Sequence, residues 1–427
     1  MLYLRMQEDF LHYVWKHKKL LKTNLETTLG EPIIIRSTGQ HNLNAGPDFF
    51  NAQLKIGGQL WAGNVEIHIK SSDWFLHNHE QDKAYDNVIL HVVWEHDTDV
   101  FRNNNEVMPT LELKHVVAPE LLGNYNALFN RKEKWINCET DFPSVDTFVL
   151  DNWLERLYFE RLEQKAQYIQ ALLQNTKNDW ETVCFIMLAK TFGLKVNGEA
   201  FFSVARSVDF SVVRKTQFNI MALEALLFGQ AGLLESDVQN AYYQSLVSEY
   251  RFLKLKFGLT RTSLPVQFFR LRPTNFPTIR LSQLANLYGR HQNLFSKLME
   301  TNTVTDFYTL FQVKASAFWN THYTFETESK AMAKAISKPF VDLLLINTVL
   351  PLKFCYAKAK NNDTNTEILN TIQAIASEKN SIVDAFNNLK PVFKTAMESQ
   401  ALIQLKTEYC NKNKCLQCAV GNLVLSG

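Results

Sequence analysis

The amino-acid sequence predicts an α+β fold, with a small mixed α/β domain over residues 1–145 and a large all-helical domain over residues 146–427. In the first part, apolar and polar residues alternate at a period of two, which is typical of strands. From Leu150 onward, apolar residues recur every three or four positions, which is typical of amphipathic helices. We therefore expect the boundary near DFPSVDTF, residues 141–148. The helical domain is long enough for two packed bundles.

In chain order, the first part is expected to contain a helix, a hairpin and further strands. Apolar residues at helical spacing, followed by the basic run KHKKLLK, predict a helix over residues 7–22. Apolar runs predict strands over 32–36, 87–96 and 108–116, and the Gly57-Gly58 turn predicts a hairpin of 51–56 with 59–70. In the helical part, loop breaks are expected near residues 192–201, 228–236, 263–278 and 360–367.

The composition is that of a globular protein without a strong overall charge. Hydrophobic residues make up 46% of the chain, and the net charge of +2 creates no global field toward nucleic acid or membrane. Glu8 and Asp9 interrupt the apolar stretch that a signal peptide needs, and no later segment offers about 18 uninterrupted apolar residues. We therefore expect no membrane partner. Because the six cysteines are sparse and unevenly spread, we expect a reducing cytoplasm.

One face of the second hairpin strand carries an unusual set of polar residues. Glu66, His68 and Lys70 share that face because side chains alternate along a strand. Asp48 precedes the hairpin, so both carboxylates could reach one point, with His68 about 6.6 Å and Lys70 about 13 Å along the face. Carboxylate oxygens suit Mg²⁺ or Mn²⁺. We therefore expect Asp48 and Glu66 to hold the metal, and His68 or Lys70 to assist an attacking water.

These residues carry a resemblance to a known enzyme superfamily. Pro47-Asp48 before the hairpin and Glu66-Ile67-His68 on its second strand resemble the PD-(D/E)XK nucleases. The resemblance implies a restriction-endonuclease-like domain that cuts DNA or RNA with a divalent metal. The sequence departs from the motif at His68, where the superfamily has lysine. Imidazole can orient or deprotonate water near neutral pH, and a nuclease fold without nuclease activity is the alternative.

Histidines provide a second candidate site in the same region. Six of the eleven histidines lie between His41 and His96, including His77, His79 and His91. Their spacing permits a zinc or iron site of a His-ligated hydrolase, although the HExxH signature is absent. The simplest alternative is a solvated strand face. We rank the carboxylate site above the histidine site.

A longer resemblance extends over nearly the whole chain. The segments GPDF, VEIHIKSSDW, NVILHVVWEHD, RLRPTNFPTIRL and CLQCAVGN resemble an uncharacterised bacterial family, domain of unknown function 2851. This resemblance implies no biochemical activity.

The stretch from Arg251 to Met299 has nine positive residues and no acidic ones. Arginine forks match phosphate oxygens, and interleaved aromatic rings could stack on bases. The candidate contacts to DNA or RNA are Arg270, Arg272, Arg280 and Arg290. These cations could instead pair with acids elsewhere in the chain. A non-catalytic nucleic-acid-binding or scaffold protein is therefore the rival of the nuclease, and the sequence identifies no protein partner.

The last motif is a cysteine cluster near the C-terminus. Cys410, Cys415 and Cys418 have the spacing C-x4-C-x2-C, which suits one metal centre with a fourth ligand from elsewhere. Cys138 is the first candidate for that ligand and Cys355 the second. Zinc and an iron–sulfur cluster both fit such a set, and three reduced cysteines packed in a terminal helix are the alternative.

Overall fold

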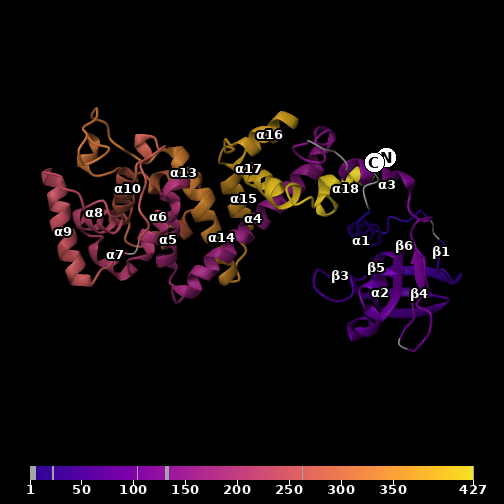
Figure 1. Ribbon diagram of the computed structural model, residues 1–427. Coiled ribbons are helices and arrows are strands. Elements are labelled where there is room, and N and C mark those ends of the chain that lie inside the picture. The colour runs from indigo at the N-terminus through magenta and orange to yellow at the C-terminus, as the bar shows by residue number, and fades with distance from the viewer. Residues whose placement is uncertain (1–5, 22–23, 103, 130–133, 262, 427) are drawn as a thin grey trace. The chain divides into compact units, whose positions relative to one another are not determined.

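The computed structural model describes residues 6–21, 24–102, 104–129, 134–261 and 263–426. The chain divides into two compact units, which are Met1–Trp153 with Leu405–Gly427, and Leu154–Gln404 (Figure 1). The first unit holds the sheet and the second is helical, so the expected α+β class is confirmed. The division differs from the expected one at the C-terminus, because residues 405–427 group with the N-terminal unit and not with the helices.

Seven strands form one mixed sheet within the described residues. In the order of the sheet, the main path runs β1-β2-β4-β5-β6-β7, and β3 pairs with β4 alone. The pairs from β1 to β5 are antiparallel, whereas β5, β6 and β7 run parallel. The bounds are β1 Leu25–Glu26, β2 Pro32–Ser37, β3 Gln40–His41, β4 Phe49–Ile56, β5 Gln59–Lys70, β6 Val88–Glu95 and β7 Thr110–Glu112.

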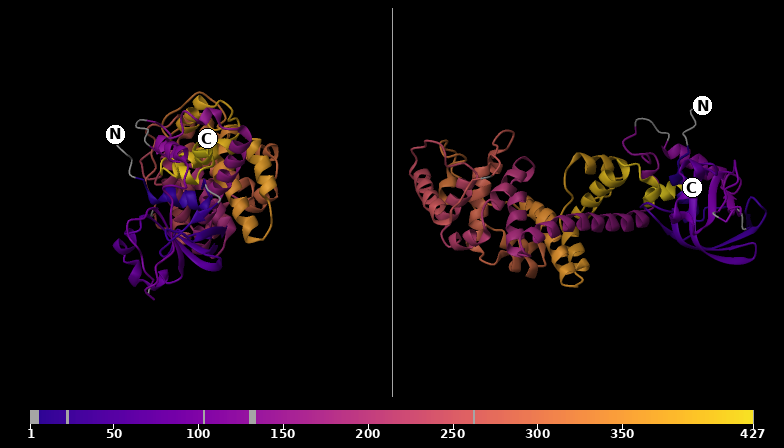
Figure 2. Two further views of the ribbon diagram at one scale, coloured as in Figure 1. Left: turned by 90° about the vertical axis from the view of Figure 1, so that its right-hand side faces the viewer. Right: turned by 60° about the horizontal axis from the view of Figure 1, so that its bottom comes forward.

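The helices of this unit come from both ends of its sequence. They are α1 Glu8–Lys16, α2 Asp73–Leu76, α3 Pro119–Phe129 and α18 Ala419–Ser426, with 3-10 turns His79–Gln81, Lys83–Tyr85, Phe142–Ser144 and Cys415–Gln417 and the π-helix Leu405–Cys410. The helix predicted over 7–22 ends at Lys16, because Lys18 adopts a positive φ of 50°. The C-terminal α18 contacts α3 (Figure 2).

A β-bulge separates the start of β4, next to Asp48, from the regular part of the hairpin. The register of β4 against β5 shifts between Phe49 and Ala52, and Asn51 has a φ of 56°. On β5, Gly63 lies against β6, where a Cβ atom would come within 2.6 Å of the Asn87 carbonyl oxygen. These two features set the course of the chain on either side of Asp48 and Glu66.

The sheet is covered on both faces around β5 and β6. Val65 and Ile67 are buried on one face, as expected from their alternation with the polar residues. Glu66 and His68 on the other face are also buried, at 5% and 1% exposure. Such burial of polar groups requires hydrogen-bond or metal partners, so this face is more than a solvated strand surface.

The second unit consists of helices that surround an aliphatic and aromatic core. They are α4 Thr147–Asn175, which starts in the first unit, α5 Trp180–Phe192, α6 Leu194–Arg206, α7 Phe210–Thr216, α8 Ile220–Gln230, α9 Ala241–Phe257, α10 Pro277–Arg290, α11 Leu294–Glu300, α12 Val304–Leu310, α13 Lys338–Leu344, α14 Leu350–Ala359, α15 Asn365–Gln373, α16 Ser381–Leu389 and α17 Ala396–Gln404. The break predicted near 192–201 is present but short, because α5 ends at Phe192 and α6 begins directly after Gly193.

One helical stretch in this unit has the length and composition of a membrane span. A π-helical segment joins α13 and α14 into a 22-residue stretch, Lys338–Ala359, with a mean hydropathy of 1.5 in its most apolar window. Of that window, 78% is buried inside the protein. This burial is typical of a core helix.

Candidate metal centre

The turn before β4 and the middle of β5 bring two carboxylates together. The backbone N–H of Asp48 donates to Oε2 of Glu66 at 3.1 Å, and the N–H of Ile67 donates to Oδ2 of Asp48 at 2.9 Å. This exchange fixes both side chains at the bulged end of the hairpin. The structure thus places Asp48 beside Glu66, in the arrangement that the hairpin predicts.

Three histidines converge on the same point. One ring nitrogen from each of His68, His77 and His79 lies within 4.8 Å of the other two. Nε2 of His68 lies 3.1 Å from Nδ1 of His77, and Oε1 of Glu66 lies 3.3 Å from Nε2 of His79 and 3.5 Å from Nε2 of His68. The Glu66 carboxylate therefore lies beside two of these three histidines. We call this set, Glu66 with His68, His77 and His79, the histidine–carboxylate centre.

The segment after β5 explains how His77 and His79 reach the centre. The short helix α2 is anchored at its start, where Asp73 accepts a hydrogen bond from the N–H of Lys70 at 2.9 Å. Asn78 then adopts the left-handed conformation, with φ of 59° and ψ of 34°, which asparagine tolerates better than most residues. This reversal separates the two histidines and lets both rings contact His68, with ring centroids 5.0 and 5.3 Å away.

His91 on β6 supports His68 from the side of the sheet. Nδ1 of His68 lies 2.8 Å from Nε2 of His91, whose side chain is fully buried. Burial, followed by the neighbouring histidines, lowers the pKa of His68 to about 2 and that of His91 to about 3. Both rings are therefore neutral over the physiological pH range, which is the state that a metal-binding imidazole needs.

The protonation of this pair is compatible with metal binding. In a neutral imidazole one nitrogen carries the proton and the other accepts. When Nε2 of His68 binds a metal, its Nδ1–H donates to Nε2 of His91, in the manner of the outer-sphere partners that orient metal ligands. Nδ1 of His91 is buried and has no hydrogen-bond partner in the described part of the chain. Without a metal, the same rings can form a hydrogen-bonded chain from His91 through His68 to His77.

Burial and neighbouring charge hold a proton near the centre. Burial of Glu66 raises its pKa to about 7, although the hydrogen bond with His79 opposes that rise. A bound cation would favour the ionised form of this carboxyl. Glu66 therefore has the environment of a ligand whose charge is balanced by a metal ion.

Helix α1 adds a second acid–base pair beside Asp48. Nε2 of His12 lies 3.3 Å from Oδ2 of Asp48. Burial lowers the pKa of His12, but the interaction with Asp48 outweighs burial, so that this pKa lies above its ordinary value. Burial, followed by the charge of Asp48, raises the pKa of Glu8. The Asp48 carboxylate thus favours the protonated form of the His12 ring.

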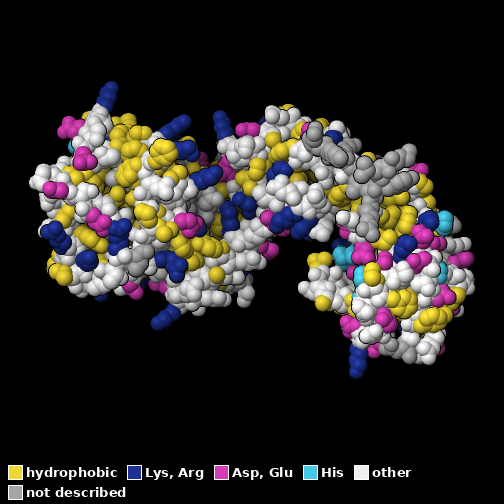
Figure 3. All heavy atoms as spheres, viewed as in Figure 1, with side chains coloured by type: hydrophobic (Ala, Val, Ile, Leu, Met, Phe, Trp, Pro, Cys, Tyr) yellow, Lys and Arg dark blue, Asp and Glu magenta, His cyan; other side chains and the backbone are white. Residues whose placement is uncertain are grey.

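A surface pocket lies next to the centre. His79 lines it and stacks on Tyr85, with ring centroids 3.7 Å apart and planes inclined by 19°. Trp74 and Arg102 also line the pocket, and the Arg102 guanidinium lies 5.7 Å from the ring of Trp61. Aromatic surface and a cation are the groups that bind bases and phosphates. Figure 3 shows histidine and acidic side chains close together on the visible face of this unit.

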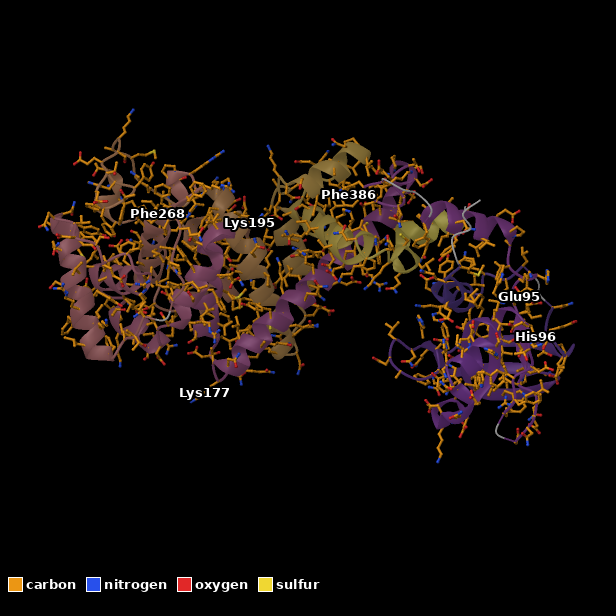
Figure 4. All side chains as sticks on the ribbon, viewed as in Figure 1. Glu95, His96, Lys177, Lys195, Phe268 and Phe386 are labelled. Atoms are coloured by element: carbon orange, nitrogen blue, oxygen red, sulfur yellow. The ribbon has the colours of Figure 1, made fainter. Side chains whose placement is uncertain are left out.

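Lys70 and His96 form ion pairs outside the histidine–carboxylate centre. Lys70 is half exposed and its Nζ lies 3.9 Å from Oδ2 of Asp97, so its ion pair is with Asp97 and not with Glu66. His96, labelled in Figure 4, follows the end of β6, and its Nε2 lies 3.2 Å from Oδ1 of Asp99. Of the four residues that the sequence proposed for the carboxylate site, Lys70 thus has its ion pair elsewhere, whereas Asp48, Glu66 and His68 lie together.

The arginine set of the helical unit is divided by burial. Arg280 is only 7% exposed, donates hydrogen bonds to Gln283 at 2.9 Å and Asn275 at 2.6 Å, and lies 3.5 Å from the ring centroid of Phe340. This burial argues against the predicted contact of Arg280 with nucleic acid, because both terminal nitrogens of its guanidinium are bound by Gln283 and Asn275 inside the protein.

The remaining arginines of that set are at the surface. Arg270 and Arg272 are exposed in the segment before α10, and exposed Arg290 donates to the carbonyl oxygen of Gln312. Figure 3 shows lysine and arginine side chains scattered among acidic and apolar ones on the visible face of this unit. Phe268 from the same basic segment is labelled in Figure 4 and packs against Phe276. A role of Arg270, Arg272 and Arg290 in nucleic-acid binding stays a prediction.

The cysteine motif forms a second candidate site in the first unit. Cys410, Cys415 and Cys418 line one cavity together with Cys138, which the sequence proposed as the fourth ligand. Cys355 belongs to α14 in the helical unit, where its thiol donates to the carbonyl oxygen of Ala166 at 3.7 Å.

Sequence reasoning missed part of the site. It ranked His77 and His79 below the carboxylates, and it gave no role to His12 or Glu8 on α1. The available signal was the spacing of Glu8 and His12, four positions apart, which places both on one face of the predicted helix.

Comparison with known proteins gives a family and no activity. No curated protein and no solved structure matches the chain. A family model matches residues 8–381, a range that includes the sheet and all the histidines of the centre and ends before Cys410. The family resemblance predicted from the sequence is confirmed, and the chain belongs to the DUF2851 family of proteins of unknown function.

Proposed function

We propose that the N-terminal unit is a metal-dependent hydrolase and that its substrate is a phosphodiester of DNA or RNA. The observation that carries this proposal is the convergence of His68, His77 and His79 within 4.8 Å beside the Glu66 carboxylate. Three imidazoles and one carboxylate form a common ligand set for catalytic transition metals.

The ligand set changes the expected metal. Mg²⁺ prefers oxygen ligands, whereas imidazole suits zinc, iron and related ions. A site with three histidines and one glutamate therefore favours Zn²⁺, Fe²⁺ or Mn²⁺ over Mg²⁺. We accordingly place the metal at the histidine–carboxylate centre and give Asp48 a supporting role, because its Oδ2 already accepts from the backbone of Ile67.

The chain's own groups then have distinct tasks. A bound divalent ion supplies charge stabilisation and a water of lowered pKa. His91 orients His68 through the 2.8 Å contact between their ring nitrogens. His12, whose pKa is raised by Asp48, is the candidate general acid for a leaving oxygen. Asp48 in turn orients His12 through the 3.3 Å contact between Oδ2 and Nε2.

The choice of a phosphodiester rests on two supports. The resemblance to PD-(D/E)XK nucleases places Asp48 and Glu66 at the hairpin positions where such enzymes hold their metal, and here these residues meet. The adjacent pocket is lined by Arg102, which is partly exposed, and by the largely buried Trp74 and Tyr85. An accessible guanidinium suits a phosphate group.

The test uses the full chain after removal of metal by a chelator. Mn²⁺ binding is measured by titration calorimetry, and hydrolysis is measured on bis-p-nitrophenyl phosphate and on a single-stranded oligonucleotide. Mn²⁺ should bind with one site at the centre and activate hydrolysis, while Mg²⁺ should bind far more weakly. His77→Ala is the main variant, because His77 is exposed and its loss leaves the core intact.

His96→Ala is the matched control from the same unit, since His96 pairs with Asp99 outside the centre. His77→Ala should weaken Mn²⁺ binding at least 100-fold, and His96→Ala should leave it unchanged. Equal Mn²⁺ affinity in the two variants contradicts the metal centre. Normal binding in the wild type without hydrolysis of either substrate contradicts the phosphodiesterase assignment alone.

A further inference from the structure

Four cysteines, Cys138, Cys410, Cys415 and Cys418, line one cavity, which we call the cysteine cavity. The rest of its lining is largely apolar and includes Phe142. Three of the four cysteines are buried, and all four are free thiols. Four thiols around one enclosed space are unusual, because cysteines in a packed core normally contact other side chains and leave no shared cavity.

The four sulfurs belong to segments that are far apart in the sequence. Asn137 and Cys415 are separated by 278 positions, and Nδ2 of Asn137 donates to Sγ of Cys415 at 3.4 Å. Burial raises the pKa of the Cys138 thiol to about 12, and the next causes are Cys418 and Cys415. Burial, followed by Cys418, Cys138 and Cys415, raises the pKa of Cys410. The Cys138 and Cys410 thiols are therefore close enough to Cys415 and Cys418 for their charges to interact.

The spacing of the sulfurs distinguishes two kinds of centre. A tetrahedral zinc ion with Zn–S bonds of about 2.3 Å sets its sulfurs about 3.8 Å apart. Among the described residues, His68, His77 and His79 form the group of three potential ligand atoms within 4.8 Å of one another. No three of these four sulfurs are that close. A cluster with its own iron and sulfide atoms sets its cysteine sulfurs farther apart than a single ion does.

The backbone around the motif is built to present the sulfurs. Cys418 accepts hydrogen bonds from the backbone N–H groups of Val420 and Gly421 at the start of α18. A Cβ atom at Gly421 would lie 2.0 Å from the carbonyl oxygen of Cys415, so this position requires glycine. Cys410 ends a π-helical turn, a distortion that is common at functional sites. Hydrogen bonds to the sulfurs, from these amides and from Asn137, are a usual feature of iron–sulfur ligands.

From this geometry we propose that Cys138, Cys410, Cys415 and Cys418 ligate an iron–sulfur cluster that joins the C-terminal segment to the end of the α/β domain. The cluster is independent of the proposed hydrolase activity, because none of its ligands belongs to the histidine–carboxylate centre. Its role is structural in the first place, since it connects Cys138 with a segment that follows the entire helical unit.

The test is anaerobic purification of the full chain, followed by reconstitution with ferrous iron and sulfide. Iron, acid-labile sulfide and zinc are counted per chain, and Mössbauer spectra identify the cluster type. Two or four irons with matching sulfide are expected, because four cysteine ligands suit both common cluster types. Cys418→Ser and Cys138→Ser should each reduce the bound iron and sulfide severalfold.

Cys184→Ser and Cys355→Ser are the matched controls, because both residues are buried cysteines of the helical unit. Both should retain the full iron and sulfide content. Stoichiometric zinc that excludes iron overturns the proposal, and so does the absence of both metals after reconstitution. If the ligand variants fail to fold, the wild-type iron and sulfide count decides alone. Mn²⁺ binding by the histidine–carboxylate centre is unaffected in either case.

Discussion

The histidine–carboxylate centre and the cysteine cavity lie in the same unit but differ in ligand type, spacing and origin in the sequence. In the first, the three ring nitrogens lie within 4.8 Å of one another beside a carboxylate. In the second, four sulfurs surround a cavity and no three of them are so close. Closely spaced imidazoles suit one ion, whereas four thiols that surround a cavity suit a cluster. The comparison shows that spacing, as well as ligand chemistry, distinguishes candidate metal sites.

The two sites also depend differently on the fold. His68 and His77 are nine positions apart, and a single strand, helix and turn bring them together. Asn137 and Cys415 are 278 positions apart, so the cysteine cavity exists only when the C-terminal segment has returned to the first unit. Local damage should therefore affect one site and spare the other.

The largest effect is expected for Glu66→Gln. The amide keeps the size of the side chain but removes its charge beside His68 and His79. Metal affinity and hydrolysis should fall at least 100-fold, because the loss of outer-sphere partners alone costs about 10- to 100-fold. Calorimetry with Mn²⁺ measures this, and the iron content of the reconstituted protein should stay at the wild-type value. A parallel loss of iron would show that the two sites are not separate.

His91→Phe should have the next largest effect. The phenyl ring fills the buried space but cannot accept the hydrogen bond from Nδ1 of His68. Metal affinity should fall about 10- to 100-fold, the usual cost of losing an outer-sphere partner. Unchanged affinity in this variant would mean that His68 is oriented by other contacts. The same variant should leave iron and sulfide at the cysteine cavity unchanged.

The pH dependence of stability should also identify His91. Its pKa is about 3 in the folded protein and near 6.5 in the unfolded chain, because burial disfavours the charged ring. Below pH 6.5 the unfolded chain takes up a proton that the folded protein does not, so acidification destabilises the fold. In metal-free protein, the free energy of unfolding of wild type relative to His91→Phe should fall by roughly 1.4 kcal/mol per pH unit as pH drops from 6.5 toward 3. Urea titrations at several pH values measure this difference, and a constant difference would contradict the neutral buried state.

The smallest effect is expected for Arg102→Ala in the pocket beside His79. If this guanidinium binds a substrate phosphate, KM for an oligonucleotide should rise about tenfold, which corresponds to a charge-assisted hydrogen bond of about 1.5 kcal/mol. Hydrolysis of the small substrate bis-p-nitrophenyl phosphate should change less. Metal affinity should be unaffected, since Arg102 contacts no residue of the centre in the described contacts. An oligonucleotide KM that stays at the wild-type value would remove this pocket from the substrate site.

The sequence predicted several contacts within the two sites. Alternation along β5 correctly put Glu66 and His68 on one face, and the hairpin correctly brought Asp48 beside Glu66. It also proposed Cys138 as the partner of the C-terminal cysteines, which share one cavity with it. These inferences needed only strand periodicity and the count of ligands.

Other features depended on backbone geometry or packing that a sequence pattern does not contain. The approach of His77 and His79 depends on the left-handed conformation of Asn78, which no periodicity reveals. Arg280 appeared as one more exposed cation in a basic stretch, yet α10 buries it against Phe340. Lys70 ends β5 on the same face as Glu66 and His68, but its ammonium group pairs with Asp97, which follows β6. Charge along a sequence therefore did not predict charge on a surface.

The central claim is that the histidine–carboxylate centre holds a metal ion, and a crystal structure of Mn²⁺-soaked protein tests it most directly. Anomalous differences should place one ion at bonding distance, about 2.0–2.3 Å, from ring nitrogens of His68, His77 and His79 and from an oxygen of Glu66. Nδ1 of His68 should remain bonded to His91. An unoccupied centre at saturating Mn²⁺, with Nε2 of His68 still 3.1 Å from Nδ1 of His77, would instead show a metal-free chain of hydrogen-bonded histidines.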